Sequence, residues 1–160
     1  MIRFLIGAVI VLSSFKMVAQ SIPVMNYAEL ETYLEKDQNK LVLVNFWATW
    51  CKPCVEELPD FLQLDEELKG ENFKMVLVSL DFSNQIEKRV IPFVNKHNIT
   101  ASVIVLDDPD ANTWINKVDP SWDGAIPVSL VLHKGKKEFH EGILNYEQLN
   151  NLIIPKLNDK

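Results

Sequence analysis

Metal-binding side chains are scarce in this chain of 160 residues, which contains only two cysteines and three histidines. The cysteines form one C-x-x-C pair, Cys51 and Cys54, and no second pair is present. A structural zinc site normally takes four cysteine or histidine ligands, and the three histidines show no ligand spacing. We therefore predict that the chain binds no metal, and a metal site at the cysteine pair is the less favoured alternative.

Clustered positive charge is also lacking. The chain has 16 Lys+Arg against 22 Asp+Glu, which gives a formal net charge of −6. Nucleic-acid binding depends on lysines and arginines gathered in a patch or stripe that displaces counterions from phosphates. We therefore predict no nucleic-acid partner and expect the partners to be proteins.

The N-terminal apolar run is too short for a typical membrane span. It extends over residues 4–12, whereas a membrane-spanning helix needs roughly 20 apolar residues, and Lys16 soon follows. Arg3 precedes the run and small Ala19 offers a cleavage point, which is typical of a signal peptide. We predict that residues 1–19 are a signal peptide and that the chain is exported; an uncleaved membrane anchor is the alternative.

Low-complexity tracts and internal repeats are absent as well. The composition is 48% hydrophobic and 24% charged, and the length of 160 residues suits one hydrophobic core. We predict a single domain over residues 20–160 and expect it to be a monomer.

The cysteine pair stands where a strand pattern gives way to a helix pattern. Residues 41–47 are apolar, β-branched or aromatic with one polar interruption, as expected of a strand that is covered on both faces. Between Val55 and Leu68 the apolar residues recur at helical spacing. Cys51 therefore falls at the start of a helix, where free N–H groups, the helix dipole and the charge of Lys52 favour a thiolate.

This position predicts different roles for the two cysteines. We expect Cys51 to be the attacking thiolate, and Cys54, one helical turn deeper, to resolve a mixed disulfide. Pro53 suits the first helical turn, where its missing N–H costs nothing. A structural disulfide is the alternative, but a bridge that closes so short a loop constrains the unfolded chain little. Redox chemistry is the favoured interpretation.

A family resemblance is carried by residues 44–54, Val-Asn-Phe-Trp-Ala-Thr-Trp-Cys-Lys-Pro-Cys, and by residues 56–59, Glu-Glu-Leu-Pro. This stretch resembles the thioredoxin superfamily and is most similar to its extracytoplasmic TlpA/ResA branch. With Gly-Ala-Ile-Pro at residues 124–127, the resemblance covers most of the chain beyond residue 20. It implies an α/β thioredoxin-like fold, a central mixed sheet flanked by helices.

The resemblance also implies a function. It suggests an exported, periplasmic or otherwise extracytoplasmic thiol-disulfide oxidoreductase that exchanges a Cys51–Cys54 dithiol or disulfide with protein substrates. No cofactor beyond this disulfide is expected. A reductive role of the cytochrome c maturation type and a membrane electron donor are further expectations.

A redox-inactive or metal-handling binding module on the same fold is the alternative function. The copper chaperones related to this branch carry three residues between their cysteines and a distant partner histidine. In this chain two residues, Lys52 and Pro53, separate the cysteines. The spacing therefore favours the oxidoreductase.

The resemblance identifies Pro127 as the cis-proline of the superfamily. The loop that carries it lies beside the redox pair in the family, so the backbone groups of Ile126 would hydrogen-bond an incoming cysteine peptide. Trp50, Lys52 and Pro53 would complete the substrate-binding surface. The alternative for Pro127 is an ordinary trans proline at the start of a strand.

Glu57 is the candidate proton acceptor for Cys54. Asn45 stands where thioredoxin carries an aspartate, and an amide cannot accept a proton. Glu57 follows Cys54 by three residues on the same helical face, where the TlpA/ResA pattern also has an acid. A partly buried carboxylate with a raised pKa could take the Cys54 proton. The alternative is that Glu57 is a solvated surface acid.

Three tryptophans could contribute to the core or to the rim of the site. We expect Trp50, next to Cys51, to belong to an apolar docking surface, and Trp47 to pack under the sheet. Trp122 precedes the proline loop; packing is its favoured role, and flanking the redox pair is the alternative.

Capping and apolar patterns predict the remaining elements. We expect helices over residues 26–35, 83–97 with Ser83 and Asn84 as caps, 108–118, and from Asn145 onward, with strands over residues 73–80, 103–106, 128–132 and 136–141. Asn26 and Glu29 have capping-box spacing, and Asp108-Pro109 has the pattern of an N-cap and a first-turn proline.

Overall fold

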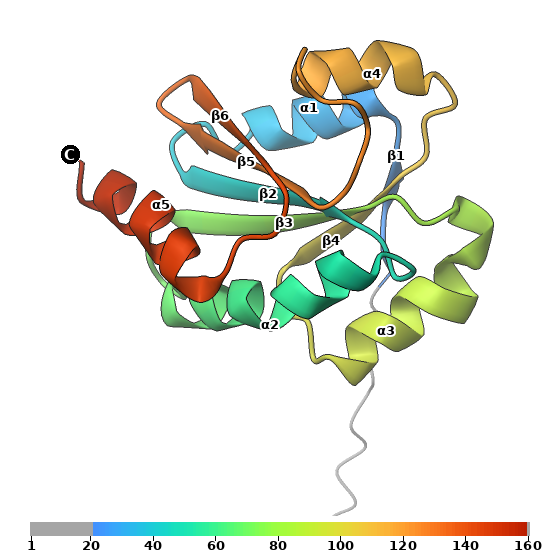
Figure 1. Ribbon diagram of the computed structural model, residues 1–160, viewed down its shortest axis with the longest axis horizontal. Helices are drawn as coiled ribbons and strands as arrows, with labels where there is room; N and C mark the ends of the chain where they lie inside the picture. The colour runs from blue at the N-terminus through green and yellow to red at the C-terminus, as the bar shows by residue number, and fades with distance from the viewer. Residues whose placement is uncertain (1–20, 160) are drawn as a thin grey trace, which may run out of the picture.

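The computed structural model describes residues 21–159 (Figure 1). The predicted signal peptide lies outside these residues, so it stays a prediction. Within residues 21–159, no helix combines the length and the apolar character that a membrane crossing requires.

The centre of the molecule is a six-stranded mixed sheet with the strand order β1-β4-β3-β2-β5-β6. The strands are β1 (Val24–Met25), β2 (Leu41–Trp47), β3 (Phe73–Ser79), β4 (Ser102–Leu106), β5 (Val128–His133) and β6 (Lys136–Glu141). The pairs among β1, β4, β3 and β2 are parallel, whereas β2–β5 and β5–β6 are antiparallel. The predicted mixed α/β sheet is confirmed.

Helices cover both faces of the sheet (Figure 1). One face carries α1 (Tyr27–Glu35) and α4 (Ala111–Val118), and the other carries α2 (Lys52–Glu67), α3 (Ile91–Lys96) and α5 (Tyr146–Asn158). All seven residues of β2 are buried, because its side chains alternate between two apolar layers. Trp47 packs on the α2 side and Phe46 on the α1 side. This double burial explains the apolar run.

Local capping signals hold as predicted at two helices. The Asn26 side chain accepts a hydrogen bond from the Glu29 N–H at 3.0 Å, and the Glu29 carboxylate accepts one from the Asn26 N–H at 2.9 Å. Asn145 forms the same reciprocal pair with Gln148 at the start of α5. Both helix starts are therefore fixed by residues within four positions of each other.

The single helix expected over residues 83–97 is wrong in detail. The segment is a 3₁₀ turn (Ser83–Gln85), a π-helical turn (Ile86–Val90) and then α3. Pro92 lies at the start of α3, where its missing N–H needs no partner; inside one continuous helix it would interrupt the hydrogen-bond ladder. Neither Ser83 nor Asn84 makes a side-chain capping bond here.

The predicted N-cap at Asp108 is also wrong. Helix α4 begins at Ala111, with Asp110 in the N-cap position. The Asp108 carboxylate instead accepts hydrogen bonds from the N–H of Tyr27 at 3.1 Å and of Asp110 at 3.0 Å. Asp108 thus joins the start of α1 to the loop before α4, a tertiary contact that displaces the local cap.

Candidate active site

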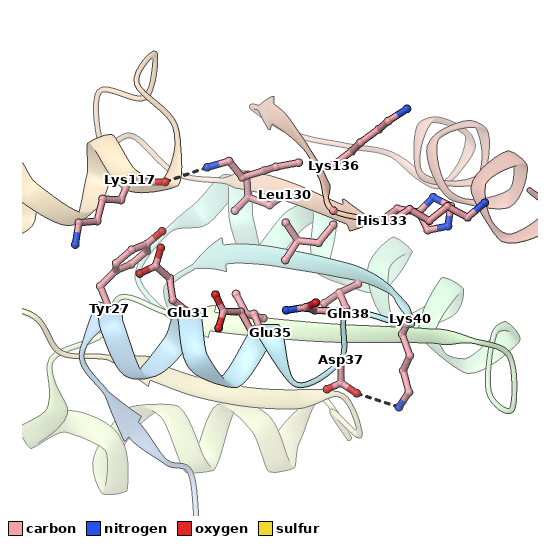
Figure 2. Close-up of a pocket in the computed structure, with 16 residues that line it drawn as sticks. Tyr27, Glu31, Glu35, Asp37, Gln38, Lys40, Lys117, Leu130, His133 and Lys136 are labelled. Atoms are coloured by element: carbon pink, nitrogen blue, oxygen red, sulfur yellow. Dashed lines mark hydrogen bonds and ion pairs between the residues drawn. The ribbon is translucent and has the colours of Figure 1, made fainter.

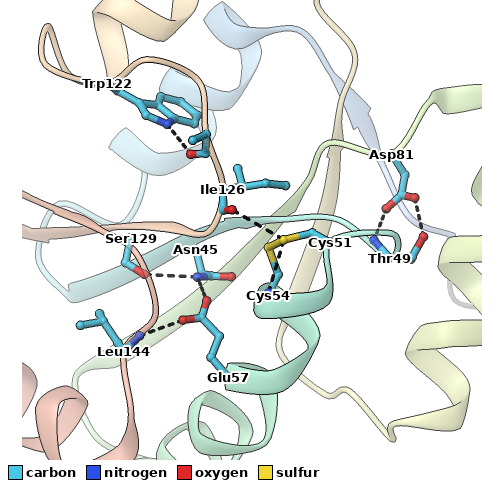
Figure 3. The surroundings of a disulfide bond; sticks show 11 residues. Asn45, Thr49, Cys51, Cys54, Glu57, Asp81, Trp122, Ile126, Ser129 and Leu144 are labelled. Atoms are coloured by element: carbon cyan, nitrogen blue, oxygen red, sulfur yellow. Dashed lines mark hydrogen bonds between the residues drawn. A yellow bond between two sulfur atoms is a disulfide. The ribbon is translucent and has the colours of Figure 1, made fainter.

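A disulfide between Cys51 and Cys54 stands at the N-terminus of α2 (Figure 3). Cys51 is the N-cap residue, and its Sγ accepts a hydrogen bond from the Cys54 N–H at 3.3 Å. Lys52 and Pro53 form the first positions of the helix. The free N–H groups of this first turn and the helix dipole therefore act on the Cys51 sulfur.

Both cysteines are largely covered, Cys51 with 5% and Cys54 with 1% of its surface exposed. The order agrees with the expectation that Cys54 lies deeper. The Lys52 side chain is 87% exposed and its Nζ lies 3.6 Å from a Glu56 carboxylate oxygen. Water and this neighbouring acid screen the positive charge, so Lys52 contributes less to a Cys51 thiolate than the helix start does.

The Ile126–Pro127 loop faces the disulfide across a short gap. The Ile126–Pro127 peptide is cis, and the Ile126 carbonyl oxygen lies 3.7 Å from Cys51 Sγ. The trans alternative for Pro127 is therefore wrong. Figure 3 shows the Ile126 carbonyl directed at the sulfur. A backbone edge next to the reactive sulfur can receive an extended peptide.

Trp122 supports this loop from the core. Its side chain is 3% exposed and its Nε1–H donates to the Ala125 carbonyl oxygen at 2.6 Å. Its ring centroid lies 5.2 Å from that of Phe46 and 5.6 Å from that of Trp114. Packing, the favoured role for Trp122, is what the structure shows.

Glu57 is buried behind the disulfide, with only 2% of its surface exposed. Its Oε1 accepts a hydrogen bond from Asn45 Nδ2, and its Oε2 accepts one from the Leu144 N–H, each at 2.9 Å. Asn45 Nδ2 also donates to Ser129 Oγ at 3.2 Å. The alternative of a solvated surface acid is wrong, because α2 directs this side chain inward (Figure 3).

Burial raises the pKa of Glu57 from 4.5 to about 7, and the charge of Asp60 adds to this rise. The hydrogen bonds from the Leu144 N–H and the Asn45 amide act in the opposite direction and only partly offset the cost of burial. Near neutral pH both protonation states are populated. A carboxylate in this condition can take up a proton and release it.

Asp81 is a residue of the site that the sequence did not reveal. It is 1% exposed, and its carboxylate accepts hydrogen bonds from the Thr49 N–H at 2.8 Å and the Thr49 hydroxyl at 2.5 Å. Ser79 Oγ donates to the same carboxylate at 2.8 Å. Asp81 therefore fixes the loop that leads into Cys51 to the end of β3.

A sequence signal for Asp81 does exist. It directly follows the strand predicted at residues 73–80, and Thr49 lies two residues after the end of the one at residues 41–47. Parallel strands have their carboxyl ends at the same edge of a sheet, where functional residues gather. Ser129 is a comparable case, a polar residue within an apolar strand, whereas the Leu144 N–H carries no side-chain signal.

The tryptophans beside the motif differ in exposure. Trp50 is 56% exposed, as a docking residue must be, although that role stays a prediction. Trp47 is fully buried, and its ring centroid lies 5.1 Å from that of Phe93. The expectation that Trp47 packs under the sheet is confirmed.

A groove of about 360 Å³ lies away from the disulfide, between α1 and the β5–β6 hairpin (Figure 2). Its floor is apolar, with Val42 and Leu130, and acids of α1 face lysines of the hairpin and α4. None of the predicted site residues lines it. Within residues 21–159, no group of three or more His, Cys, Asp or Glu side chains could hold a metal ion. The expected lack of a metal stays a prediction.

The sequence profile of the AhpC/TSA family matches residues 14–136. The chain belongs to the AhpC/TSA family. Over 72 residues it is 35% identical to the thioredoxin-like protein YneN of Bacillus subtilis, a match that covers 45% of this chain and 42% of YneN. Over 66 residues it is 38% identical to the thiol-disulfide oxidoreductase ResA of Oceanobacillus iheyensis, covering 41% of this chain and 33% of ResA. The chain thus matches less than half the length of either relative.

Solved structures show the fold of this AhpC/TSA member independently. A secreted thiol-disulfide isomerase from Corynebacterium glutamicum superposes with a TM-score of 0.65 at 21% identity, over 79% of this chain and 75% of that one. At this identity the likeness establishes the fold alone. The predicted thioredoxin-like fold and the resemblance to the ResA type are confirmed.

Proposed function

We propose that this AhpC/TSA family member is a thiol-disulfide oxidoreductase that exchanges the Cys51–Cys54 pair with protein disulfides. The observation that carries the proposal is the position of this disulfide: Cys51 is the N-cap residue of α2, and its Sγ lies 3.7 Å from the Ile126 carbonyl oxygen. The sequence matches to the thiol-disulfide oxidoreductase ResA and to the thioredoxin-like protein YneN support the proposed exchange activity.

In the first step of the proposed reaction, the reduced chain attacks a substrate disulfide. The Cys51 thiolate, favoured by the start of α2, forms a new S–S bond with one substrate sulfur. The old substrate S–S bond breaks, and its other sulfur leaves as a thiolate that takes a proton from water. Chain and substrate are then joined by a mixed disulfide.

In the second step, Cys54 resolves this intermediate. Its thiol gives its proton to the Glu57 carboxylate, and the resulting thiolate attacks Cys51 Sγ. The Cys51–Cys54 bond forms, the mixed disulfide breaks, and the second substrate sulfur leaves. Two electrons have moved from the cysteine pair to the substrate.

Binding of the substrate uses the surface around Cys51. The backbone of Ile126, before Pro127, would hydrogen-bond an extended peptide, and exposed Trp50 with Lys52 and Pro53 would contact its side chains. No additional cofactor is needed, because the disulfide itself carries the two electrons.

We further propose an exported, extracytoplasmic monomer that acts as a reductant of the cytochrome c maturation type. The resemblance of residues 44–54 to the extracytoplasmic TlpA/ResA branch supports this proposal, and the match to the thiol-disulfide oxidoreductase ResA supports the exchange activity. In an oxidising compartment the pair must be reduced again, so a membrane electron donor would return two electrons after each cycle.

The reduction potential of the pair tests the proposed direction. The purified chain is equilibrated in dithiothreitol and glutathione buffers of graded potential, and its free thiols are alkylated and counted by mass spectrometry. We expect a reduction potential of about −270 mV, as in thioredoxin. A reduction potential of about −120 mV, as in the oxidant DsbA, would contradict a reductive role. A disulfide that does not exchange with either buffer would contradict redox function.

A further inference from the structure

The chain turns at Gly142, between the last strand and the last helix. Strand β6 ends at Glu141, and Gly142 has a φ of +88°, a conformation that residues other than glycine rarely adopt. A Cβ added at this position would meet no heavy atom within 4 Å, so the backbone angle rather than a lack of space calls for glycine. After the turn the chain passes beside α2, where Leu144 contacts Glu57.

Residues 142–144, here called the positioning segment, are bound at both ends to parts of the disulfide site. The Gly142 N–H donates to the Pro127 carbonyl oxygen at 2.9 Å. Two residues later the Leu144 N–H donates to Glu57 Oε2 at 2.9 Å, as Figure 3 shows. The segment therefore joins the loop that faces Cys51 to the buried carboxylate of Glu57.

The place of the Leu144 N–H is set from both directions along the chain. The Leu144 side chain is 9% exposed and packs in the apolar layer that also holds Cys54. The next residue, Asn145, is the N-cap of α5 and forms a capping box there. On the other side the turn at Gly142 fixes the direction in which the chain leaves β6.

We propose that the positioning segment holds Glu57 as the proton acceptor: the turn at Gly142 directs the Leu144 N–H onto the carboxylate and so sets the pH at which Cys54 is deprotonated. The inference rests on the proposed function and adds to it a control of the second step. A backbone N–H that donates to a carboxylate stabilises the charged form, so it lowers the pKa of Glu57 and opposes the rise that burial causes. Without this bond Glu57 would stay protonated up to a higher pH.

Several elements face the Glu57 carboxylate with titratable or polar groups. These groups are Cys54 and Asp60 of α2, Asn45 of β2, Ser129 of β5 and the Leu144 N–H. The charge of Asp60 raises the pKa of Glu57. Asp60 itself accepts a hydrogen bond from the Tyr146 N–H at 3.1 Å. The backbone of residues 144–146 thus binds both Glu57 and the charged group that acts on it.

Replacement of Gly142 with valine tests the inference, because a β-branched residue is strongly disfavoured at a positive φ. Release of reduced substrate is measured in single turnovers with a disulfide-bonded peptide from pH 5 to pH 9. In Gly142→Val the midpoint of the release rate should move up by about one pH unit or more, because a hydrogen bond to a charged group is lost. Release at pH 7 should then slow about fivefold. Formation of the mixed disulfide should keep its rate, because the start of α2 is unchanged.

Two further variants separate positioning from a loss of stability. Gly70, after the end of α2, has nearly the same φ of +89°, and an added Cβ there also meets no atom within 4 Å. Gly70→Val should therefore lower the urea midpoint about as much as Gly142→Val and keep the wild-type pH profile. Gly142→Asn should keep that profile as well, because asparagine tolerates a positive φ. If Gly142→Val does not fold, Gly142→Ala against Gly70→Ala gives the same comparison with a smaller strain.

NMR of the oxidised wild type gives a readout that needs no activity. The Leu144 amide proton should shift with a midpoint near pH 7 as Glu57 ionises, and Glu57→Gln should abolish this shift. A Leu144 amide that does not titrate, a folded Gly142→Val with the wild-type midpoint, or an equal change in Gly70→Val would each overturn the positioning role and leave the oxidoreductase in place. A wild type that releases no reduced peptide would overturn the proposed function and this inference with it.

Discussion

Replacing Glu57 with glutamine removes a buried charge while it keeps the shape of the side chain. Burial raises the pKa of Glu57 from 4.5 to about 7, which corresponds to about 3 kcal/mol of free energy against ionisation in the folded state. The unfolded chain loses this proton near pH 4.5 and the folded chain near pH 7. The contribution of Glu57 to the free energy of unfolding is therefore fully present below pH 4.5, where the carboxyl is protonated in both states. It is lost as the pH rises through 7.

The glutamine variant can satisfy the hydrogen bonds that surround the position. Its side-chain oxygen can accept from the Leu144 N–H, as Glu57 Oε2 does. Its amide would then face Asn45, whose own side-chain amide can rotate to offer its oxygen. Ser129 can donate to that oxygen instead of accepting from the nitrogen. We therefore expect Glu57→Gln to fold.

Urea unfolding of the oxidised proteins at pH 4 and pH 8 measures the effect. We expect the stability of Glu57→Gln relative to wild type to increase by up to about 3 kcal/mol between these pH values, or about 10 °C in Tm. Glu56→Gln is the matched control, because the Glu56 side chain is 58% exposed, and it should follow the wild type. The same pH dependence in Glu57→Gln and wild type would refute the assignment of a raised pKa to Glu57.

The same variant tests the proton transfer. Without a carboxylate, Cys54 lacks its acceptor, so release of reduced substrate should slow by about 100-fold while formation of the mixed disulfide keeps its rate. The wild-type release rate should rise with pH through about 7, as Glu57 ionises, and the variant should lack this rise. Single-turnover release from pH 5 to pH 9 gives both profiles. Superimposable profiles would make water the acceptor.

Three further predictions concern the cysteines, the loop and a helix cap. In single-cysteine variants, iodoacetamide should label Cys51 faster than Cys54 near pH 7, because the helix start favours the Cys51 thiolate; faster labelling of Cys54 would reverse the roles. Asp81→Ala should lower the free energy of unfolding by about 1–3 kcal/mol in urea titrations, because the Thr49 N–H loses its buried partner, and an unchanged midpoint would exclude this contact as a support of the loop. Asn145→Ala should cost about 1 kcal/mol by loss of the α5 cap, and a shift near zero would show that the cap is dispensable.

The parts of the structure that local sequence determines could be predicted. The strand at residues 41–47 and the helix start at Cys51 follow from the spacing of apolar residues on either side of the C-x-x-C pair. The Asn26 and Asn145 caps depend on residues three positions away. Pro127 was identified through the family motif rather than through any physical rule, because most X-Pro bonds are trans.

The parts that depend on distant contacts could not be predicted. Asp108 has the sequence context of a helix cap, but the N–H of Tyr27, 81 positions away, binds its carboxylate. Glu57 could be placed on the right face of its helix, whereas its partner at the Leu144 backbone could not be foreseen. Residues 83–97 form a 3₁₀ turn, a π-helical turn and α3 instead of the one helix that the sequence predicts, with Pro92 at the start of α3.

Trapping of the mixed disulfide tests the central claim most directly. Fully reduced Cys54→Ser is mixed with a disulfide-bonded peptide, quenched in acid, and analysed by mass spectrometry after proteolysis. We expect a covalent adduct on Cys51 to accumulate in this variant, while wild type passes through it to oxidised chain and reduced peptide, and Cys51→Ser forms far less adduct. Two results would contradict the claim that Cys51 attacks and Cys54 resolves. One is an adduct that forms on Cys54 of Cys51→Ser at the wild-type rate. The other is the lack of an adduct on Cys51 of Cys54→Ser.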